Sequence, residues 1–129
     1  MNFINSVKLL PILSMLLTLP LDAWAGSEQE QVVNASWYGQ RYAGRRTASG
    51  ERFDPRAVTA AHPSLPLGSL AEVRRKSDDR RVVVRINDRG PARGDGIDLS
   101  EAAARMLGII AAGTALVVVT PVSQLAEHR

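Results

Sequence analysis

The feature that most constrains the fold of this chain is a series of short stretches rich in β-branched, aromatic or alternating apolar residues, separated by turns that contain glycine or proline. Such stretches are typical of β-strands, and they are predicted at residues 32–38, 57–61, 69–74, 81–86, 97–99 and 115–119. One helix is predicted over residues 102–107, because Ser100 can cap its first turn and Gly108 can end it. Five or six short strands with one helix favour a small closed or nearly closed barrel, which avoids exposed strand edges. The spacing alone does not distinguish one barrel type from another.

The N-terminal residues, 1–25, have the pattern of a secretory signal peptide. Lys8 gives a weak positive charge ahead of an apolar block, and Ala23 and Ala25 place small residues before a predicted cleavage site. The apolar block is shorter than the roughly 20 residues of a membrane-spanning helix. This favours a cleaved signal peptide over the alternative, an uncleaved membrane anchor. We therefore expect a periplasmic or secreted protein with no stable membrane insertion after cleavage. The remaining chain is predicted to divide into a disordered lead-in, a folded domain and a polar tail, at residues 26–32, 33–121 and 122–129.

The composition excludes several kinds of chemistry. The chain has no cysteine, so cysteine nucleophiles and lipid attachment through an N-terminal cysteine are excluded. Only His62 and His128 could supply imidazole ligands, so no zinc site is predicted, and no cofactor is expected. The net charge of +3 is mild. No basic run alternates with aromatic residues, which disfavours nucleic acid as a partner.

Three residues are candidates for chemistry, and each also has an ordinary structural interpretation. Asp88 ends a β-branched run and precedes a Gly-Pro turn, so it could be a general acid or base, or a carboxylate that bonds to nearby backbone and shapes the turn. Glu51 follows a glycine in a long irregular segment and could be a solvated surface acid. His62 precedes a proline and could be a turn residue that bonds to backbone. The residues alone leave these alternatives open.

Five ordered blocks of sequence carry a resemblance to a known family. They are Ala35-Ser36-Trp37-Tyr38-Gly39, Thr47-Ala48-Ser49-Gly50-Glu51, Ala60-Ala61-His62-Pro63 with Leu65-Pro66-Leu67-Gly68, Asn87-Asp88-Arg89-Gly90-Pro91, and Ile97-Asp98-Leu99-Ser100. In this order they closely resemble the rare lipoprotein A-like (RlpA-like) domain. The resemblance covers about residues 33–119. It implies a mainly β fold, a six-stranded double-psi β-barrel with one short α-helix, related to expansins and barwin-like proteins.

The resemblance also implies an activity. Enzymes of this family are lytic transglycosylases, which cut peptidoglycan between N-acetylmuramic acid and N-acetylglucosamine and leave a 1,6-anhydro end on the muramic acid. The family's acidic pair falls on Glu51 and Asp88, with His62 in the same groove. Asp88 is expected to be the acid and base, and Glu51 to stabilise charge or orient substrate. The two roles could also be exchanged.

Further substrate-binding residues are expected beside this pair. Neighbouring strand residues face opposite sides of a sheet, so one of Trp37 and Tyr38 should lie in the core and the other, Tyr38, in the groove as a platform for sugar rings. Arg85 and Arg89 are expected to bind the lactyl carboxylate of muramic acid, or else to pair with nearby aspartates. Asp98 is interpreted as structural.

The chain departs from the family pattern in two places. Many members carry a lipidated cysteine after the signal peptide and a C-terminal peptidoglycan-binding repeat domain, and neither is found in this sequence. Residues 92–96 contain an acid and two glycines where the family has a more basic, apolar approach. The expected partner is peptidoglycan glycan strands, bound by a monomer. The competing hypotheses are an expansin-like module that binds glycan without cleaving it, and a small interaction protein such as an inhibitor.

Overall fold

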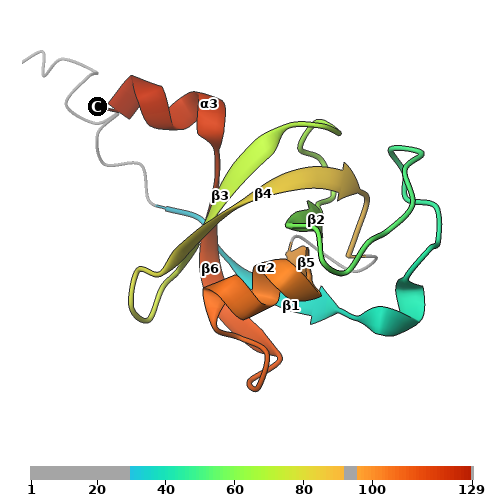
Figure 1. The fold of residues 1–129 in the computed structure, drawn as a ribbon. Helices are drawn as coiled ribbons and strands as arrows, with labels where there is room; N and C mark the ends of the chain where they lie inside the picture. The colour runs from blue at the N-terminus through green and yellow to red at the C-terminus, as the bar shows by residue number, and fades with distance from the viewer. Residues whose placement is uncertain (1–29, 92–95, 129) are drawn as a thin grey trace, which may run out of the picture.

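The computed structural model describes residues 30–91 and 96–128. Its six strands are β1 (Val32–Tyr38), β2 (Thr59–Ala61), β3 (Leu70–Arg75), β4 (Arg81–Asp88), β5 (Ile97–Ser100) and β6 (Thr114–Pro121). They close into a barrel in the order β1-β5-β2-β4-β3-β6 (Figure 1). The pairs β1–β5 and β2–β4 are parallel and the other pairs are antiparallel. The predicted barrel of six short strands is therefore confirmed. The predicted signal peptide lies outside the described residues, as does most of the predicted lead-in.

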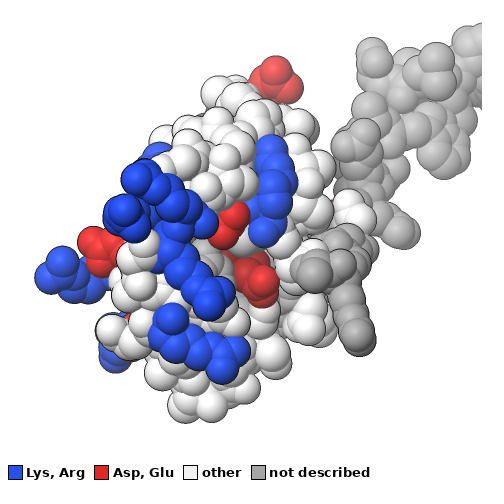
Figure 2. Space-filling view, turned by 90° about the vertical axis from the view of Figure 1, so that its right-hand side faces the viewer, with Lys and Arg blue, Asp and Glu red and all other residues white. Residues whose placement is uncertain are grey.

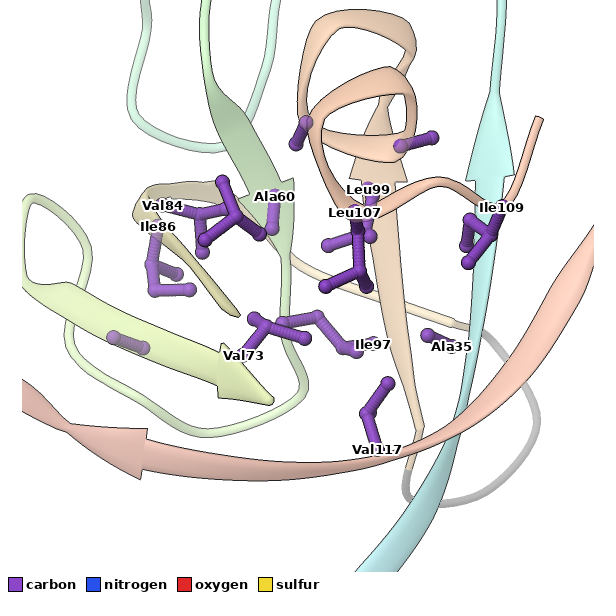
Figure 3. Packing of buried hydrophobic residues seen from close by; sticks show 14 residues of the cluster. Ala35, Ala60, Val73, Val84, Ile86, Ile97, Leu99, Leu107, Ile109 and Val117 are labelled. Atoms are coloured by element: carbon purple, nitrogen blue, oxygen red, sulfur yellow. The ribbon is translucent and has the colours of Figure 1, made fainter. Parts of the chain in front are cut away.

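The barrel is filled by side chains that alternate along its strands. In β4, Val82, Val84 and Ile86 are buried, whereas Val83 between them is 47% exposed. This alternation follows from the pleat of a strand, which points successive side chains to opposite faces. Figure 3 shows the buried residues of several strands meeting Leu107 and Ile109 in one cluster. The core therefore lies inside the barrel and extends to the helix at one side of it.

Helix α2 (Glu101–Leu107) forms where the sequence predicts it, and its two ends explain why. The Ser100 hydroxyl accepts a hydrogen bond from the backbone N–H of Ala103, which satisfies a donor of the first turn. The same hydroxyl donates to the carbonyl of Ala57 at 2.7 Å and so ties the helix start to the segment before β2. Gly108 ends the helix in the left-handed region at φ 79°.

Most element boundaries differ from the prediction by one or two residues, and the predicted polar tail differs in kind. Strand β4 continues two residues past Ile86, because Asp88 is paired in parallel with Ala61 of β2 across a register shift. The residues predicted as a polar tail form α3 (Val122–Leu125) and the short 3-10 helix η3 (Ala126–His128). Pro121 ends β6 and precedes α3, a position that suits the fixed φ of proline. In residues 30–91 and 96–128, no helix is both long and apolar enough to cross a bilayer.

Candidate active site

A long connection between β1 and β2 builds the wall of the candidate site. It begins with the 3-10 helix η2 (Gln40–Tyr42) and then folds back on itself, with the N–H of Phe53 donating to the carbonyl of Arg45 at 2.7 Å. The tip of this fold lies on the end of β4, where the N–H of Ser49 donates to the carbonyl of Asn87 at 3.1 Å. Segments from distant parts of the sequence are thus brought together at one side of the barrel.

This arrangement encloses an open hollow of about 450 Å³. Its walls come from the end of β1, from η2 and the connection after it, from the ends of β2 and β4, and from β5. They include Tyr38, Tyr42, Arg45, Phe53, Asp88 and Asp98. Figure 2 shows acidic side chains in the middle of this face with basic side chains on several sides of them. The hollow therefore presents carboxylates within a positively charged rim.

Asp88 lies at the mouth of the barrel, as the last residue of β4. Its Oδ1 accepts hydrogen bonds from the N–H groups of Ala48 and Arg89, both at 2.9 Å. The hydrogen bonds that join the Asp88 carboxyl to other described residues all use this one oxygen. The bond to Ala48 also anchors the tip of the β1–β2 connection, so the structural interpretation of Asp88 holds alongside any chemical one. Because Asp88 lines the hollow, its carboxyl is in place to meet a bound molecule.

Glu51 lies in a different setting. Its Oε1 accepts from Nη1 of Arg85 and from Nδ2 of Asn87, both at 2.7 Å. These hydrogen bonds, first the one from Arg85 and then the one from Asn87, hold the pKa of Glu51 below its usual value. Thr47 and Phe53, which flank Glu51 in the sequence, line the hollow, but Glu51 is not among the described residues that line it. Its carboxylate is therefore charged and already paired.

His62 bonds to Asp88 through its backbone, whereas its ring bonds to the turn that follows it. The N–H of His62 donates to the carbonyl of Asp88 at 3.1 Å. Its Nδ1 accepts from the N–H groups of Ser64 and Leu65 at 3.1 and 3.0 Å. Burial, and then the charge of Arg89, lower the pKa of the imidazole, so the ring is neutral with its proton on Nε2. His62 lines a separate hollow of about 190 Å³.

The two predicted arginines are both occupied by groups of the protein. Arg85 donates to Glu51, as described above. Arg89 donates through Nη1 to the carbonyl oxygens of His62 and Leu65 at 3.1 and 2.7 Å, and so ties the β2–β3 connection to β4. Arg89 nevertheless lines the hollow, and so does Arg45, whose guanidinium lies 5.3 Å from the centre of the Tyr42 ring. The adjacent arginines at positions 45 and 46 are the sequence feature that could have predicted this basic wall.

Comparison with known proteins identifies the domain. A family model described as "Lytic transglycolase", of the double-psi β-barrel type, matches residues 30–119. The chain belongs to this family. The family resemblance inferred from the five sequence blocks is thereby confirmed.

Members of the lytic transglycolase family with similar sequences come from several bacteria. The chain is 50% identical over 90 residues to the endolytic peptidoglycan transglycosylase RlpA of Neisseria meningitidis serogroup A, which covers 69% of the chain and 38% of that protein. It is 58% identical over 84 residues to the probable endolytic peptidoglycan transglycosylase RlpA of Nostoc sp., covering 63% of the chain and 23% of that protein. The matched region thus spans less than two fifths of these relatives.

Solved structures show the same fold at lower sequence identity. The Streptomyces papain inhibitor matches with a TM-score of 0.59 and 23% identity, over 74% of this chain and 96% of the inhibitor. An expansin of Clavibacter michiganensis matches with a TM-score of 0.57 and 23% identity, over 73% of this chain and 50% of the expansin. These similarities support the double-psi β-barrel architecture of the domain and carry no further statement about its activity.

Tyr38 of this lytic transglycolase domain lines the hollow, whereas Trp37 packs against the core cluster. The Tyr38 ring lies 4.6 Å from that of Phe53 at a tilt of 40°, and 5.8 Å from that of Tyr42 in an edge-on arrangement, both between ring centres. Burial, then the charge of Asp88, then that of Asp98, raise the pKa of Tyr38. The ring is therefore a packed part of the wall, with a protonated hydroxyl near two carboxylates.

Asp98 is the acid whose position the sequence interpretation missed. It lies in β5 between the buried Ile97 and Leu99 and lines the hollow with Asp88. The Ser36 hydroxyl of β1 donates to its Oδ1. The alternation of apolar and acidic residues was the available signal, since it places Asp98 on the face opposite the core. Within residues 30–91 and 96–128, no group of three acidic, histidine or cysteine side chains is arranged to hold a metal ion.

Proposed function

We propose that this domain is a lytic transglycosylase that cleaves peptidoglycan between N-acetylmuramic acid and N-acetylglucosamine and leaves 1,6-anhydro ends. Its family and the printed names of its relatives support this activity. The observation that carries it is the position of Asp88, whose carboxyl lines the hollow while one of its oxygens is fixed by two backbone N–H groups. Because peptidoglycan lies outside the cytoplasmic membrane, the proposal includes action there, by a monomer.

The proposed reaction uses Asp88 as both acid and base. Asp88 donates its proton to the glycosidic oxygen, the bond from that oxygen to the anomeric carbon breaks, and the bonding electrons stay with the oxygen. The carboxylate of Asp88 then takes the proton of the muramyl 6-hydroxyl, whose oxygen bonds to the anomeric carbon. The proton balance closes on Asp88, and no water is consumed.

The other acids of the site support this assignment of roles. The pKa of Glu51 is lowered by its hydrogen bonds, so Glu51 carries a charge at neutral pH and is poorly suited to donate a proton. A fixed carboxylate near the positive charge that develops at the anomeric carbon stabilises it. We assign this electrostatic role to Glu51, and a further carboxylate is supplied by Asp98, which lines the hollow with Asp88.

The remaining predicted residues have supporting roles in this proposal. Tyr38 forms part of the wall that a sugar would contact, and His62 with Arg89 holds the β2–β3 connection beside Asp88. Arg85 holds the Glu51 carboxylate in place. Anionic groups of the glycan would meet the basic rim of the hollow first, since guanidinium groups suit carboxylates.

The test is mass spectrometry of glycan strands without stem peptides after incubation with the purified protein, beside an Asp88→Asn variant. Anhydromuramyl products from the wild type alone would support both the reaction and the role of Asp88. Reducing ends without the anhydro bond would mean hydrolysis in place of transglycosylation. Strands that are bound but not cut would contradict the proposal and indicate a glycan-binding module of the expansin type.

A further inference from the structure

The hydroxyl of Tyr38 is a buried polar group for which the described residues provide no hydrogen-bond partner. Leaving such a group unpaired is costly, and most buried polar groups in proteins are paired. Two other side-chain atoms share this condition among the described residues, Oγ1 of Thr59 and Oδ1 of Asn87. Neither Thr59 nor Asn87 lines the hollow that Tyr38 shares with Asp88. The unpaired hydroxyl of Tyr38 is therefore distinguished by its place in the candidate site.

The ring that carries this hydroxyl is held in place. Tyr38 ends β1 and packs against Phe53 and Tyr42. The hydroxyl of Tyr42 already accepts a hydrogen bond from Nη2 of Arg41 at 2.9 Å. Since the Tyr38 ring is fixed by its neighbours, any partner must come to the hydroxyl through a small movement of its own side chain.

Two carboxylates of the hollow are the acceptors near this hydroxyl. Burial first, and then the charges of Asp88 and Asp98, raise the pKa of Tyr38, which keeps it a hydrogen-bond donor at neutral pH. Asp98 accepts one hydrogen bond, from Ser36, and Asp88 accepts two. All of these bonds use Oδ1, so the bonds to described residues leave Oδ2 of both aspartates unused. Both aspartates line the hollow with Tyr38, and the charge of Asp88 acts on Tyr38 more strongly than that of Asp98, which favours Asp88 as the acceptor.

We propose that Tyr38 is a positioning residue for Asp88, whose hydroxyl donates a hydrogen bond to the Asp88 carboxylate once that carboxyl has lost its proton. A donor that bonds to the charged form stabilises it relative to the neutral form. The hydroxyl would thus ease proton release from Asp88 to the glycosidic oxygen and hold the carboxylate in place to recover a proton. This catalytic consequence rests on the proposed function, whereas the hydrogen bond itself does not.

Other charged groups also act on Asp88, and the test must hold them constant. Asp98 faces it from β5, Arg89 follows it in the chain, and Arg45 and Arg46 line the same hollow from the β1–β2 connection. Tyr38→Phe changes none of these charges and keeps the ring that packs against Phe53. Thr59→Val is the matched control, because it removes a buried unpaired hydroxyl from β2 outside the hollow.

The experiment measures the protonation of Asp88 in two ways, in wild type, Tyr38→Phe and Thr59→Val. The first is an NMR titration of the side-chain carboxyl carbons, with the Asp88 signal assigned from Asp88→Asn. The second is the pH dependence of kcat/KM, whose alkaline limb follows loss of the acid in the free enzyme. Tyr38→Phe should move both midpoints upward by about one pH unit, the usual scale for a hydrogen bond to a charged group. Thr59→Val should match the wild type.

The outcomes separate this inference from the proposed function. An upward shift in Tyr38→Phe alone supports the hydrogen bond, and identical midpoints in Tyr38→Phe and wild type overturn it. If the wild type makes no anhydromuramyl products, the proposed function fails, and the NMR titration still decides whether Tyr38 acts on Asp88. A thermal transition of Tyr38→Phe near that of the wild type would confirm that the ring packing is kept.

Discussion

Asp88 and Glu51 are two acids on the same side of the barrel, and their surroundings differ in kind. Asp88 ends a strand, bonds through one oxygen to backbone N–H groups, and lines the hollow. Glu51 lies in the β1–β2 connection, and one of its oxygens accepts from both a guanidinium and an amide. One carboxyl is held by neutral dipoles and the other by a full opposite charge.

This difference indicates which of the two acids can exchange a proton with a substrate. A guanidinium at 2.7 Å favours the charged form of a carboxyl, and the pKa of Glu51 is lowered accordingly. Environments that separate two carboxyls in this way are how enzymes assign one as acid and the other as a fixed charge. The comparison therefore predicts unequal effects when each charge is removed.

The largest effect is expected for Asp88→Asn. The amide keeps the size of the side chain and an oxygen that can accept from Ala48 and Arg89, but it cannot donate and recover a proton. Release of anhydromuramyl products should fall by at least about a thousandfold, as for loss of a general acid. The variant should still bind glycan strands and unfold near the wild-type temperature. Full activity in this variant would remove Asp88 from the mechanism and break the comparison at its first point.

A smaller loss, of at least about a hundredfold in turnover, is expected for Glu51→Gln, because a positioned charge is lost while the acid and base remains. The assay is again product release from glycan strands. Glu72→Gln is the matched control, since Glu72 also pairs with an arginine, Arg81, at 3.2 Å but lies on β3 opposite Val83, away from the end of β4 that carries Asp88. Equal rates for Glu51→Gln and the wild type would reduce Glu51 to a structural acid.

Asp98→Asn tests whether the second acid of the hollow also contributes charge. We expect turnover to fall by about tenfold, because the amide keeps an acceptor for Ser36 and loses a single charge near the reaction centre. Asp54→Asn serves as the control, since Asp54 is half exposed and pairs with Arg56. An effect larger than that of Glu51→Gln would reverse the ranking of the two supporting carboxylates.

Much of the fold could be predicted from local patterns, because they carry their own physical cause. Ser100 and Gly108 bound α2 as expected, since capping and the left-handed stop depend on a few neighbouring residues. The end of β4 could not be placed in this way. Asp88 belongs to the strand because it is paired with Ala61 of β2, and such pairing between distant segments leaves no local signal.

The site shows the same division. The family resemblance predicts Asp88 and Glu51 as the acidic pair. It does not predict that Glu51 pairs with Arg85, because these residues are 34 positions apart and charge patterns along the chain do not reveal such a contact. Alternation along the strand predicts Tyr38 on the groove side, and Tyr38 does line the hollow, but its packing against Phe53 joins distant segments and is not predicted from the sequence. The sequence alone favours a structural role for Asp98. Its place in the hollow depends on the closure of the barrel around β5.

The smallest expected effect is on the free energy of unfolding, and it tests whether Glu51 is held as a charged group by Arg85. Because the pKa of Glu51 is lowered from its usual value of 4.5 by its partners, the pair with Arg85 adds stability above that pH and loses it as the pH falls through the lowered value. Both side chains are 40% exposed, so the contribution at neutral pH should stay below about 1 kcal/mol. Urea unfolding of wild type and Glu51→Gln at pH 7 and pH 3 measures it. The difference between the two proteins should be larger at pH 7 than at pH 3, whereas an equal difference at both would assign it to packing.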